Sequence, residues 1–139
     1  MFANILIVED EMLVACEVEA VLSDLGHTIV GIAPDLETAM ALSQADLDLA
    51  LVDLNLRDGL TGPEIGRRLC EKGKCAVLFV TANPRILGEG IAGAIGVLTK
   101  PANPQAVREA VDYALRVAKG DTVATPPAAL RVFRTATGN

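Results

Sequence analysis

Five short apolar segments recur along the chain, separated by stretches with helical patterns. They are 4-NILIV-8, 28-TIVGIA-33, 48-DLALVD-53, 76-AVLFVT-81 and 95-IGVLT-99. Continuous apolar runs of this length are typical of strands buried on both faces, as in parallel sheets. Because parallel strands are joined by right-handed crossovers through helices, the pattern predicts an α/β fold, a (βα)5 doubly wound parallel sheet.

Two helices are predicted before the third strand. The first has its apolar residues at spacings that place them on one face, and Gly26 follows as its stop. These apolar residues are Val14, Val18, Val21, Leu22 and Leu25. The second helix is expected to begin at Asp35 and to bury Leu36, Ala39 and Met40.

Two further helices carry end signals. Thr61 and Glu64 have the spacing of a capping box at the start of the third helix, which is expected to end near Gly73. Asn103 is the expected N-cap of the last helix, and Gly120 ends it.

The remaining two segments lack a regular pattern. Residues 83–96 contain a proline and four glycines, which predicts a short, irregular or mobile fourth helix. Residues 120–139 are expected to be a flexible C-terminal tail with no output domain, following a single domain at 1–119. Within the tail, 129-ALRVF-133 could dock on a surface, and we interpret its apolar residues as a packing patch rather than a binding motif.

Composition excludes several classes of function. The 139-residue chain is 51% hydrophobic and 22% charged, which suits one globular core. No apolar run has the length of a membrane span, and no basic leader precedes an apolar one, so we expect a soluble cytoplasmic protein without membrane contact. A net charge of -6 disfavours direct nucleic-acid binding.

Four residues with reactive side chains are given structural interpretations. The three cysteines, Cys16, Cys70 and Cys75, lack metal-ligand spacing, so each is expected to be a buried, reduced thiol. His27 falls in the loop before the second strand, away from the ends where ligands bind. We interpret it as a half-exposed loop residue and not as a phosphotransfer histidine.

Charged and polar residues follow the strands where ligands bind in open α/β sheets, beyond the carboxyl ends. They are Glu9, Asp10 and Glu11 after the first strand, Asp53 after the third, Thr81 after the fourth and Lys100 after the fifth. Because adjacent carboxylates repel and are costly near an apolar interior, a hard divalent cation would offset them. Mg²⁺ suits such oxygen ligands. Glu11 alone is better explained as an acid in the first turn of a helix.

A phosphoryl group fits beside such a metal, since phosphoryl transfer needs positioning and charge neutralisation. A carboxylate can itself be the nucleophile, and Asp53 at the tip of a buried strand is the best candidate. Lys100 precedes Pro101, and a cis bond between them would aim the lysine inward.

At these residues the sequence resembles the receiver domain of two-component response regulators over roughly residues 3 to 119. The matching elements are Glu9-Asp10 after ILIV, Asp53 in LVDLNL, Gly62 and Pro63, Thr81-Ala82, and Lys100-Pro101. The resemblance implies a flavodoxin-like sheet with strand order 2-1-3-4-5. It also implies a phosphoryl group accepted by Asp53 from a sensor histidine kinase or a phosphotransfer protein.

The resemblance assigns the other site residues as well. Asp10 would be a direct Mg²⁺ ligand with Asp53, Glu9 would act through water, and Asn55 would offer its backbone carbonyl. Thr81 and Lys100 would bind the phosphoryl oxygens. The implied protein is a signalling module, not an enzyme, although it would assist its own phosphorylation and dephosphorylation. It would act through an unknown downstream protein or as a phosphate sink, with a homodimer as an alternative assembly.

Two departures from the family pattern bear on switching. Val97 stands where members usually carry an aromatic residue, and the segment at 83–96 is short and glycine-rich. This is similar to receivers of bacterial general-stress regulators with an irregular fourth helix. Our hypothesis is that Thr81 acts on the segment directly and orders it upon phosphorylation.

Two other classes of function remain as alternatives. A haloacid-dehalogenase-type phosphatase also uses an aspartyl nucleophile, but it carries an acid two residues later, where this chain has Asn55. A flavin- or nucleotide-binding module could share the architecture, but EDEM stands where a glycine-rich phosphate loop would follow the first strand.

Overall fold

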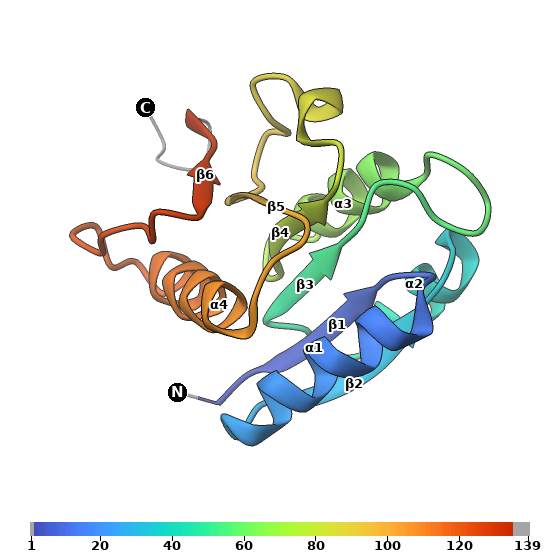
Figure 1. Ribbon diagram of the computed structural model, residues 1–139, viewed down its shortest axis with the longest axis horizontal. Helices are drawn as coiled ribbons and strands as arrows, with labels where there is room; N and C mark the ends of the chain where they lie inside the picture. Colours follow the sequence, from blue (N-terminus) through green and yellow to red (C-terminus); the bar gives the residue numbers. More distant parts are fainter. Residues whose placement is uncertain (1, 135–139) are drawn as a thin grey trace.

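Six strands form one sheet in the order β2-β1-β3-β4-β5-β6. The computed structural model describes residues 2–134. The strands are β1 (Asn4–Val8), β2 (Thr28–Ala33), β3 (Leu49–Val52), β4 (Ala76–Thr81), β5 (Gly96–Thr99) and β6 (Leu130–Val132). The first five are parallel to their neighbours, and β6 pairs antiparallel with β5. The predicted order 2-1-3-4-5 is therefore confirmed, with one strand added at the edge (Figure 1).

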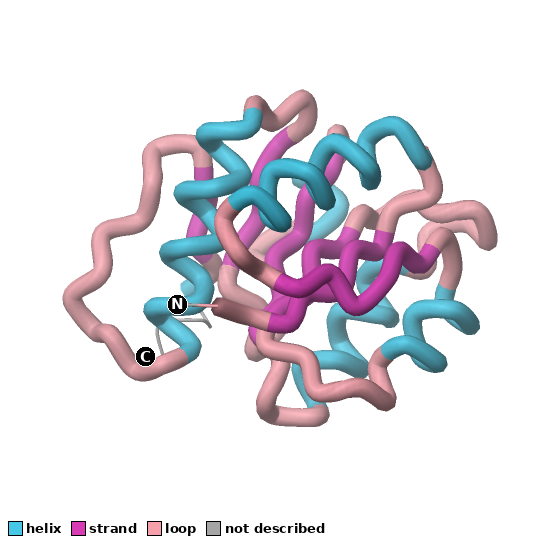
Figure 2. The backbone as a smooth tube through the Cα atoms, turned by 90° about the horizontal axis from the view of Figure 1, so that it is seen from below, coloured by secondary structure: helices cyan, strands magenta, loops and turns pink. Residues whose placement is uncertain are grey.

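The helices form a layer on each face of the sheet (Figure 2). They are α1 (Met12–Asp24), α2 (Leu36–Leu42), α3 (Gly62–Glu71), the single 3₁₀ turn η1 (Pro84–Leu87) and α4 (Pro104–Ala118). Buried residues of α1 and α4 pack on one face, and those of α2, α3 and η1 pack on the other.

The strands are apolar throughout because both of their faces are covered. In β3, Leu49 and Leu51 contribute to the core under α1 and α4, whereas Ala50 and Val52 contribute to the core under α2 and α3. All four residues are buried. Their side chains alternate between the faces, as the two-residue period of a strand requires.

Most predicted helix ends are observed. The Asp35 side chain accepts a hydrogen bond from the Thr38 N–H at 2.9 Å and caps α2. Asn103 caps α4 by accepting from the Ala106 N–H at 2.8 Å. Leu25 departs from the predicted apolar face, because it lies just past α1 and is 43% exposed.

The capping box predicted for α3 is wrong. Thr61 occupies the N-cap position without a capping hydrogen bond, and its hydroxyl donates instead to Asp58 Oδ1 at 2.6 Å. Glu64 binds the arginines that follow it, Arg67 and Arg68. Ion pairs along the helix have therefore replaced the reciprocal cap.

The segment at 83–96 is irregular, as predicted. The turn η1 is its only regular element, and it is followed by an irregular path that returns to β5. Leu87 and Ala94 are buried, so the segment is anchored at two points.

The prediction of a flexible tail is wrong for residues 130–132. These residues form β6 because they pair with the otherwise open edge of β5. The interpretation of the apolar residues as a packing patch is confirmed for Leu130 and Phe133, which are buried. Residues 135–139 lie outside the described part of the chain.

The structure places His27 and the three cysteines in different environments. His27 is partly buried, and its Nδ1 accepts a hydrogen bond from the Ala3 N–H at 3.1 Å, which ties the loop to β1. All three cysteines are free thiols. Cys16 is exposed, so the prediction of a buried thiol is wrong there, and Cys70 and Cys75 are partly buried.

Candidate functional site

The register of the sheet places the ends of β1 and β3 side by side. Val8 pairs with Val52, and the Asp53 N–H donates to the Val8 carbonyl at 2.9 Å. Glu9 is tied on its other side to β2, since its N–H donates to the Ala33 carbonyl at 2.9 Å. Glu9 and Asp53 therefore leave neighbouring strands at the same edge.

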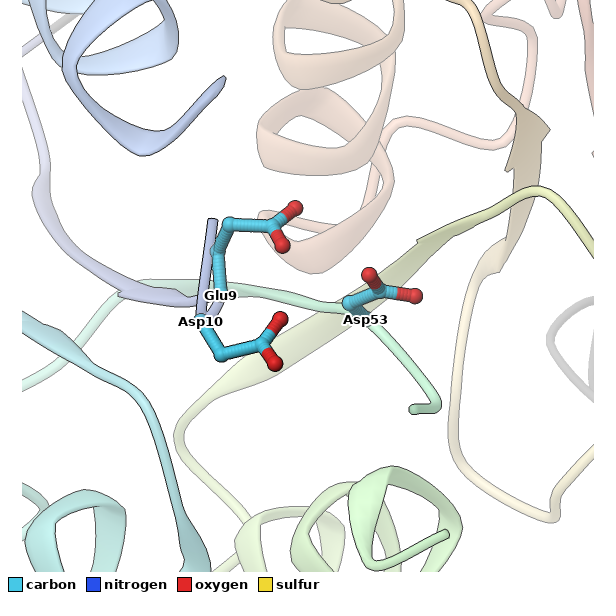
Figure 3. A group of neighbouring side chains, drawn as sticks. All are labelled: Glu9, Asp10 and Asp53. Carbon is cyan, nitrogen blue, oxygen red and sulfur yellow. The ribbon is translucent and has the colours of Figure 1, made fainter. Parts of the chain in front are cut away.

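Three carboxylates meet at this edge. One ligand oxygen from each of Glu9, Asp10 and Asp53 lies within 4.8 Å of the other two. Glu9 and Asp53 are buried, at 5% and 8% exposure, and Asp10 is partly buried. Figure 3 shows the three carboxyl groups gathered at the ends of β1 and β3. We call these three residues the acidic cluster.

Lys100 reaches the acidic cluster from the end of β5. Its Nζ lies 2.5 Å from Glu9 Oε1 and 2.8 Å from Asp53 Oδ2. The Lys100–Pro101 peptide bond is cis, as the sequence suggested. One ammonium group thus stands against three carboxylates, so the cluster keeps an excess of negative charge.

Burial and hydrogen bonding shift the pKa values of Glu9 and Lys100. Burial raises the pKa of Glu9 above its ordinary value, and this outweighs the opposing effect of Lys100. Burial alone would lower the pKa of Lys100, but hydrogen bonds to Asp53 and Glu9 outweigh it and raise that pKa. The lysine therefore remains charged at neutral pH.

Backbone amides fix the two buried carboxylates. The Leu54 N–H donates to Asp53 Oδ1 at 2.7 Å, and the Glu11 N–H donates to Glu9 Oε2 at 3.2 Å. The Lys100 bond uses the other oxygen of each group. The side chain of Glu11 is exposed, in keeping with its interpretation as an acid at the start of a helix.

Thr81 lies at the end of β4 and is fully buried. Its backbone carbonyl accepts from the Lys100 N–H at 2.9 Å, which aligns the ends of β4 and β5. Its hydroxyl oxygen accepts from the Asn83 N–H at 3.1 Å. The hydroxyl is thus engaged with the start of the 83–96 segment.

The loop after β3 carries Asn55, which is exposed. Side chains and backbone join this loop to the start of α2. Arg57 forms an ion pair with Asp35, and Asp58 Oδ2 accepts from the Leu36 N–H at 3.0 Å. Sequence reasoning missed this brace, because no local pattern links the two segments.

Gly62 allows the chain to pass close to the site. A Cβ at this position would lie 2.0 Å from the carbonyl oxygen of Asp53 and 2.5 Å from the Cα of Leu54. Both atoms belong to the backbone and cannot rotate away. The site therefore needs glycine at this position because of close approach and not because of an unusual backbone angle.

The chain matches the family of the response regulator receiver domain over residues 5–112. The fold, with its acidic cluster and lysine at the carboxyl edge of a parallel sheet, agrees with that match. The chain therefore belongs to the receiver domain family of two-component response regulators.

Several relatives share this domain. The phyllosphere-induced regulator PhyR of Methylorubrum extorquens is 33% identical over 119 residues, which cover 83% of this chain and 44% of PhyR. The aerobic respiration control protein ArcA of Escherichia coli K12 is 33% identical over 106 residues, covering 73% of this chain and 44% of ArcA. The chain thus spans about half the length of the curated relatives it matches.

Solved structures show the same fold. PhyR from Brucella abortus superposes with a TM-score of 0.78 at 30% identity, covering 88% of this chain and 51% of that one. The receiver domain of PhyR from Erythrobacter litoralis has a TM-score of 0.74 at 31% identity, covering 81% of this chain and 89% of that one. Among the described residues, no helix is long and apolar enough to cross a membrane.

Proposed function

We propose that this receiver accepts a phosphoryl group on Asp53 from a phosphohistidine of a sensor histidine kinase or phosphotransfer protein. The observation that carries the proposal is the contact of Lys100 with Asp53, 2.8 Å apart, beside Glu9 and Asp10. A buried carboxylate next to a fixed ammonium and two further acids has a nucleophilic oxygen and nearby charges that can be rearranged around a phosphoryl group.

The acidic cluster fits Mg²⁺. Its donors are all carboxylate oxygens, which this cation prefers, and one oxygen from each residue lies within 4.8 Å of the other two. Asp10 and Asp53 would be direct ligands, Glu9 would act through water, and Asn55 would add its backbone carbonyl. When bound, the cation supplies positive charge against the phosphoryl oxygens.

The proposed transfer is a simple displacement. A carboxylate oxygen of Asp53 attacks the phosphorus, forming an acyl phosphate while the phosphorus–nitrogen bond of the phosphohistidine breaks. The electron pair of that bond returns to the imidazole nitrogen. The Leu54 N–H holds Asp53 Oδ1, and Lys100 lies on Oδ2, so the carboxylate is already oriented.

Lys100 and Thr81 would respond once the phosphoryl group is present. The ammonium of Lys100 would exchange its Asp53 partner for a phosphoryl oxygen, because the acyl group of Asp53 no longer carries the charge of a carboxylate. The hydroxyl of Thr81 would turn away from the Asn83 N–H to donate to another phosphoryl oxygen. Phosphorylation would thereby alter the start of the 83–96 segment.

The relatives favour an output through protein contacts. One PhyR protein with a solved structure is described as a stress response regulator, and that of Bartonella quintana as an anti-anti-sigma factor. For this chain we propose only the general feature, which is a downstream protein partner that binds according to whether Asp53 is phosphorylated. Residues 1–119 would form the receiver unit, and draining phosphate from a kinase would be a second use of the same chemistry.

The test is incubation with acetyl phosphate, with and without Mg²⁺, followed by intact mass. A receiver gives one phosphoryl adduct per chain only with Mg²⁺, and the adduct is lost in strong acid or base. Rapid release of phosphate without an adduct would indicate the phosphatase alternative. No adduct and no turnover, with a flavin retained through purification, would favour the nucleotide-binding alternative.

A further inference from the structure

The edge of β5 is covered by a segment from the far end of the chain. β6 pairs Leu130 with Leu98 and Val132 with Gly96, and the Phe133 N–H continues the pairing by donating to the Ile95 carbonyl at 3.0 Å. This edge would otherwise expose unpaired backbone groups. Residues 130–133 will be called the latch.

Phe133 anchors the latch in the core. Its side chain is only 1% exposed, and its ring centroid lies 6.3 Å from that of Phe79. It belongs to the same apolar cluster as Val97, the residue found where related receivers usually carry an aromatic ring. Phe133 of the latch thus adds an aromatic ring to the apolar cluster that contains Val97, whose own strand, β5, carries no aromatic residue.

Two glycines make room for the latch. A Cβ on Gly90 would lie 2.4 Å from the Phe133 ring, and a Cβ on Gly96 would lie 2.4 Å from the backbone oxygen of Arg131. All three nearest atoms to the Gly96 position belong to the β6 backbone. The glycines counted as helix breakers in the sequence therefore have a second role, to admit β6.

Arg131 connects the latch to the irregular segment. Its guanidinium lies 5.4 Å from the Phe133 ring centroid, Nη1 donates to the Gly88 carbonyl at 3.0 Å and Nη2 to the Pro84 carbonyl at 3.4 Å. Both carbonyls lie in or just after η1, which starts next to Asn83.

The other end of this connection is the candidate phosphorylation site. The Asn83 N–H donates to Thr81 Oγ1, and Thr81 is buried at the carboxyl edge. A turn of that hydroxyl towards a phosphoryl group removes the acceptor of Asn83 and changes the path of its neighbour Pro84, whose carbonyl Arg131 holds. The contacts of Arg131 fit the arrangement in which the Asn83 N–H donates to Thr81, so they oppose a change at Thr81. The latch and the candidate phosphorylation site are coupled in this way.

We propose that the latch is a regulatory device: it holds the 83–96 segment in the resting arrangement, and occupation of the Asp53 site releases it. This rests on the proposed function of Asp53. The resting segment is already anchored by Arg131 and Phe133, so the device acts by release and not by the ordering expected from the sequence. Release uncovers the β5 edge and the Phe79 ring for a partner segment that pairs as the latch does.

The experiment uses the full chain with beryllofluoride and Mg²⁺ as a phosphoryl mimic. Amide exchange at Phe133, measured by NMR, should be about fivefold faster or more when the mimic is bound, because its hydrogen bond to Ile95 opens more often. By linkage, loosening the latch should raise the affinity for beryllofluoride by a similar factor.

Two variants loosen the latch by different routes. Arg131→Ala removes the hold on Pro84 and Gly88 without opening the core, and Gly96→Ala pushes the β6 backbone away. Arg67→Ala is the matched control, since it also removes an exposed arginine, but one on α3 whose partners are the carboxylates of Glu64 and Glu71.

Both variants should bind beryllofluoride more tightly than Arg67→Ala does. The latch proposal would be overturned by an unchanged exchange rate at Phe133 when the mimic binds, or by equal beryllofluoride affinities in Arg131→Ala and Arg67→Ala. Either result would leave the proposed function standing. If beryllofluoride binds neither the native chain nor any variant, the proposed function fails, and the latch proposal fails with it.

Discussion

Lys100 donates a hydrogen bond to Asp53, with Nζ 2.8 Å from Oδ2, although the two residues end different strands with β4 between them. The same ammonium binds Glu9. In this arrangement the lysine neutralises part of the charge that a bound cation would otherwise balance. Lys100 and a Mg²⁺ ion bound as proposed would therefore compete for the same carboxylates.

The first prediction concerns this competition. Lys100→Met should destabilise the metal-free protein by about 2–3 kcal/mol, because two buried carboxylates lose their charged hydrogen-bond donor. The same variant should bind Mg²⁺ more tightly than the native chain. Urea unfolding without metal and calorimetric titration with Mg²⁺ measure the two effects. Unchanged Mg²⁺ affinity would show that the cation does not displace the lysine.

The second prediction concerns repulsion within the acidic cluster. Because one ammonium faces three carboxylates, millimolar Mg²⁺ should raise the melting temperature by binding only the folded state. Asp10→Asn should raise the melting temperature of the metal-free protein, since it removes one repelling charge, and should abolish Mg²⁺-dependent phosphorylation. Equal melting temperatures of the native chain with and without Mg²⁺ would contradict a metal site.

The third prediction uses Gly62. Gly62→Ala should reduce phosphorylation at least tenfold, because its methyl group must displace the backbone of Asp53 and Leu54. Gly73→Ala is the control: its Cβ meets open space, but its φ of +81° makes the substitution costly by about 1 kcal/mol. Phosphorylation rates are compared at a temperature at which both variants are folded, so that loss of stability does not explain a difference between them. Equal phosphorylation rates in both would show that Gly62 does not position the acceptor.

The fourth prediction concerns pH and the brace beside the site. Hydrogen bonding with Thr38, followed by that with Arg57, lowers the pKa of Asp35 to about 2. An acid whose pKa is lower in the folded state stabilises the fold above its unfolded pKa, near 3.8, and loses that effect as pH falls towards 2.

The measurement is urea unfolding of the native chain and of Asp35→Asn between pH 7 and pH 3. The stability advantage of the native chain should be constant down to about pH 4 and shrink below it. An advantage that stays unchanged down to pH 3 would mean that the charge of Asp35 supports neither the cap of α2 nor the brace.

Most of the sheet could be predicted from local sequence, but its sixth strand could not. The runs that form β1 to β5 are apolar on both faces, a signal that each segment carries by itself. The three residues of β6 have too short a pattern, and their conformation depends on pairing with β5, next to the contacts of Phe133 with Ile95 and Phe79; all of these partners are distant in sequence. Tertiary contacts, not propensity, decide that strand.

The candidate site likewise could be predicted from the sequence only in part. The acids and Lys100 follow strand ends, so topology alone brings them to one edge, and the structure places them there. The contacts of Lys100 with two carboxylates, and the brace from Asp58 to Leu36, depend on side-chain geometry across the fold. No spacing within a single segment could indicate them.

The proposed function depends most on Asp53 as the phosphoryl acceptor. The most direct test compares the native chain with Asp53→Asn after acetyl phosphate and Mg²⁺, using intact mass and the far-ultraviolet circular dichroism spectrum. We expect one Mg²⁺-dependent phosphoryl adduct in the native chain, none in the variant, and the same spectrum for both. An adduct that persists in Asp53→Asn at the native level would contradict the proposed function, because the acceptor would then be another residue.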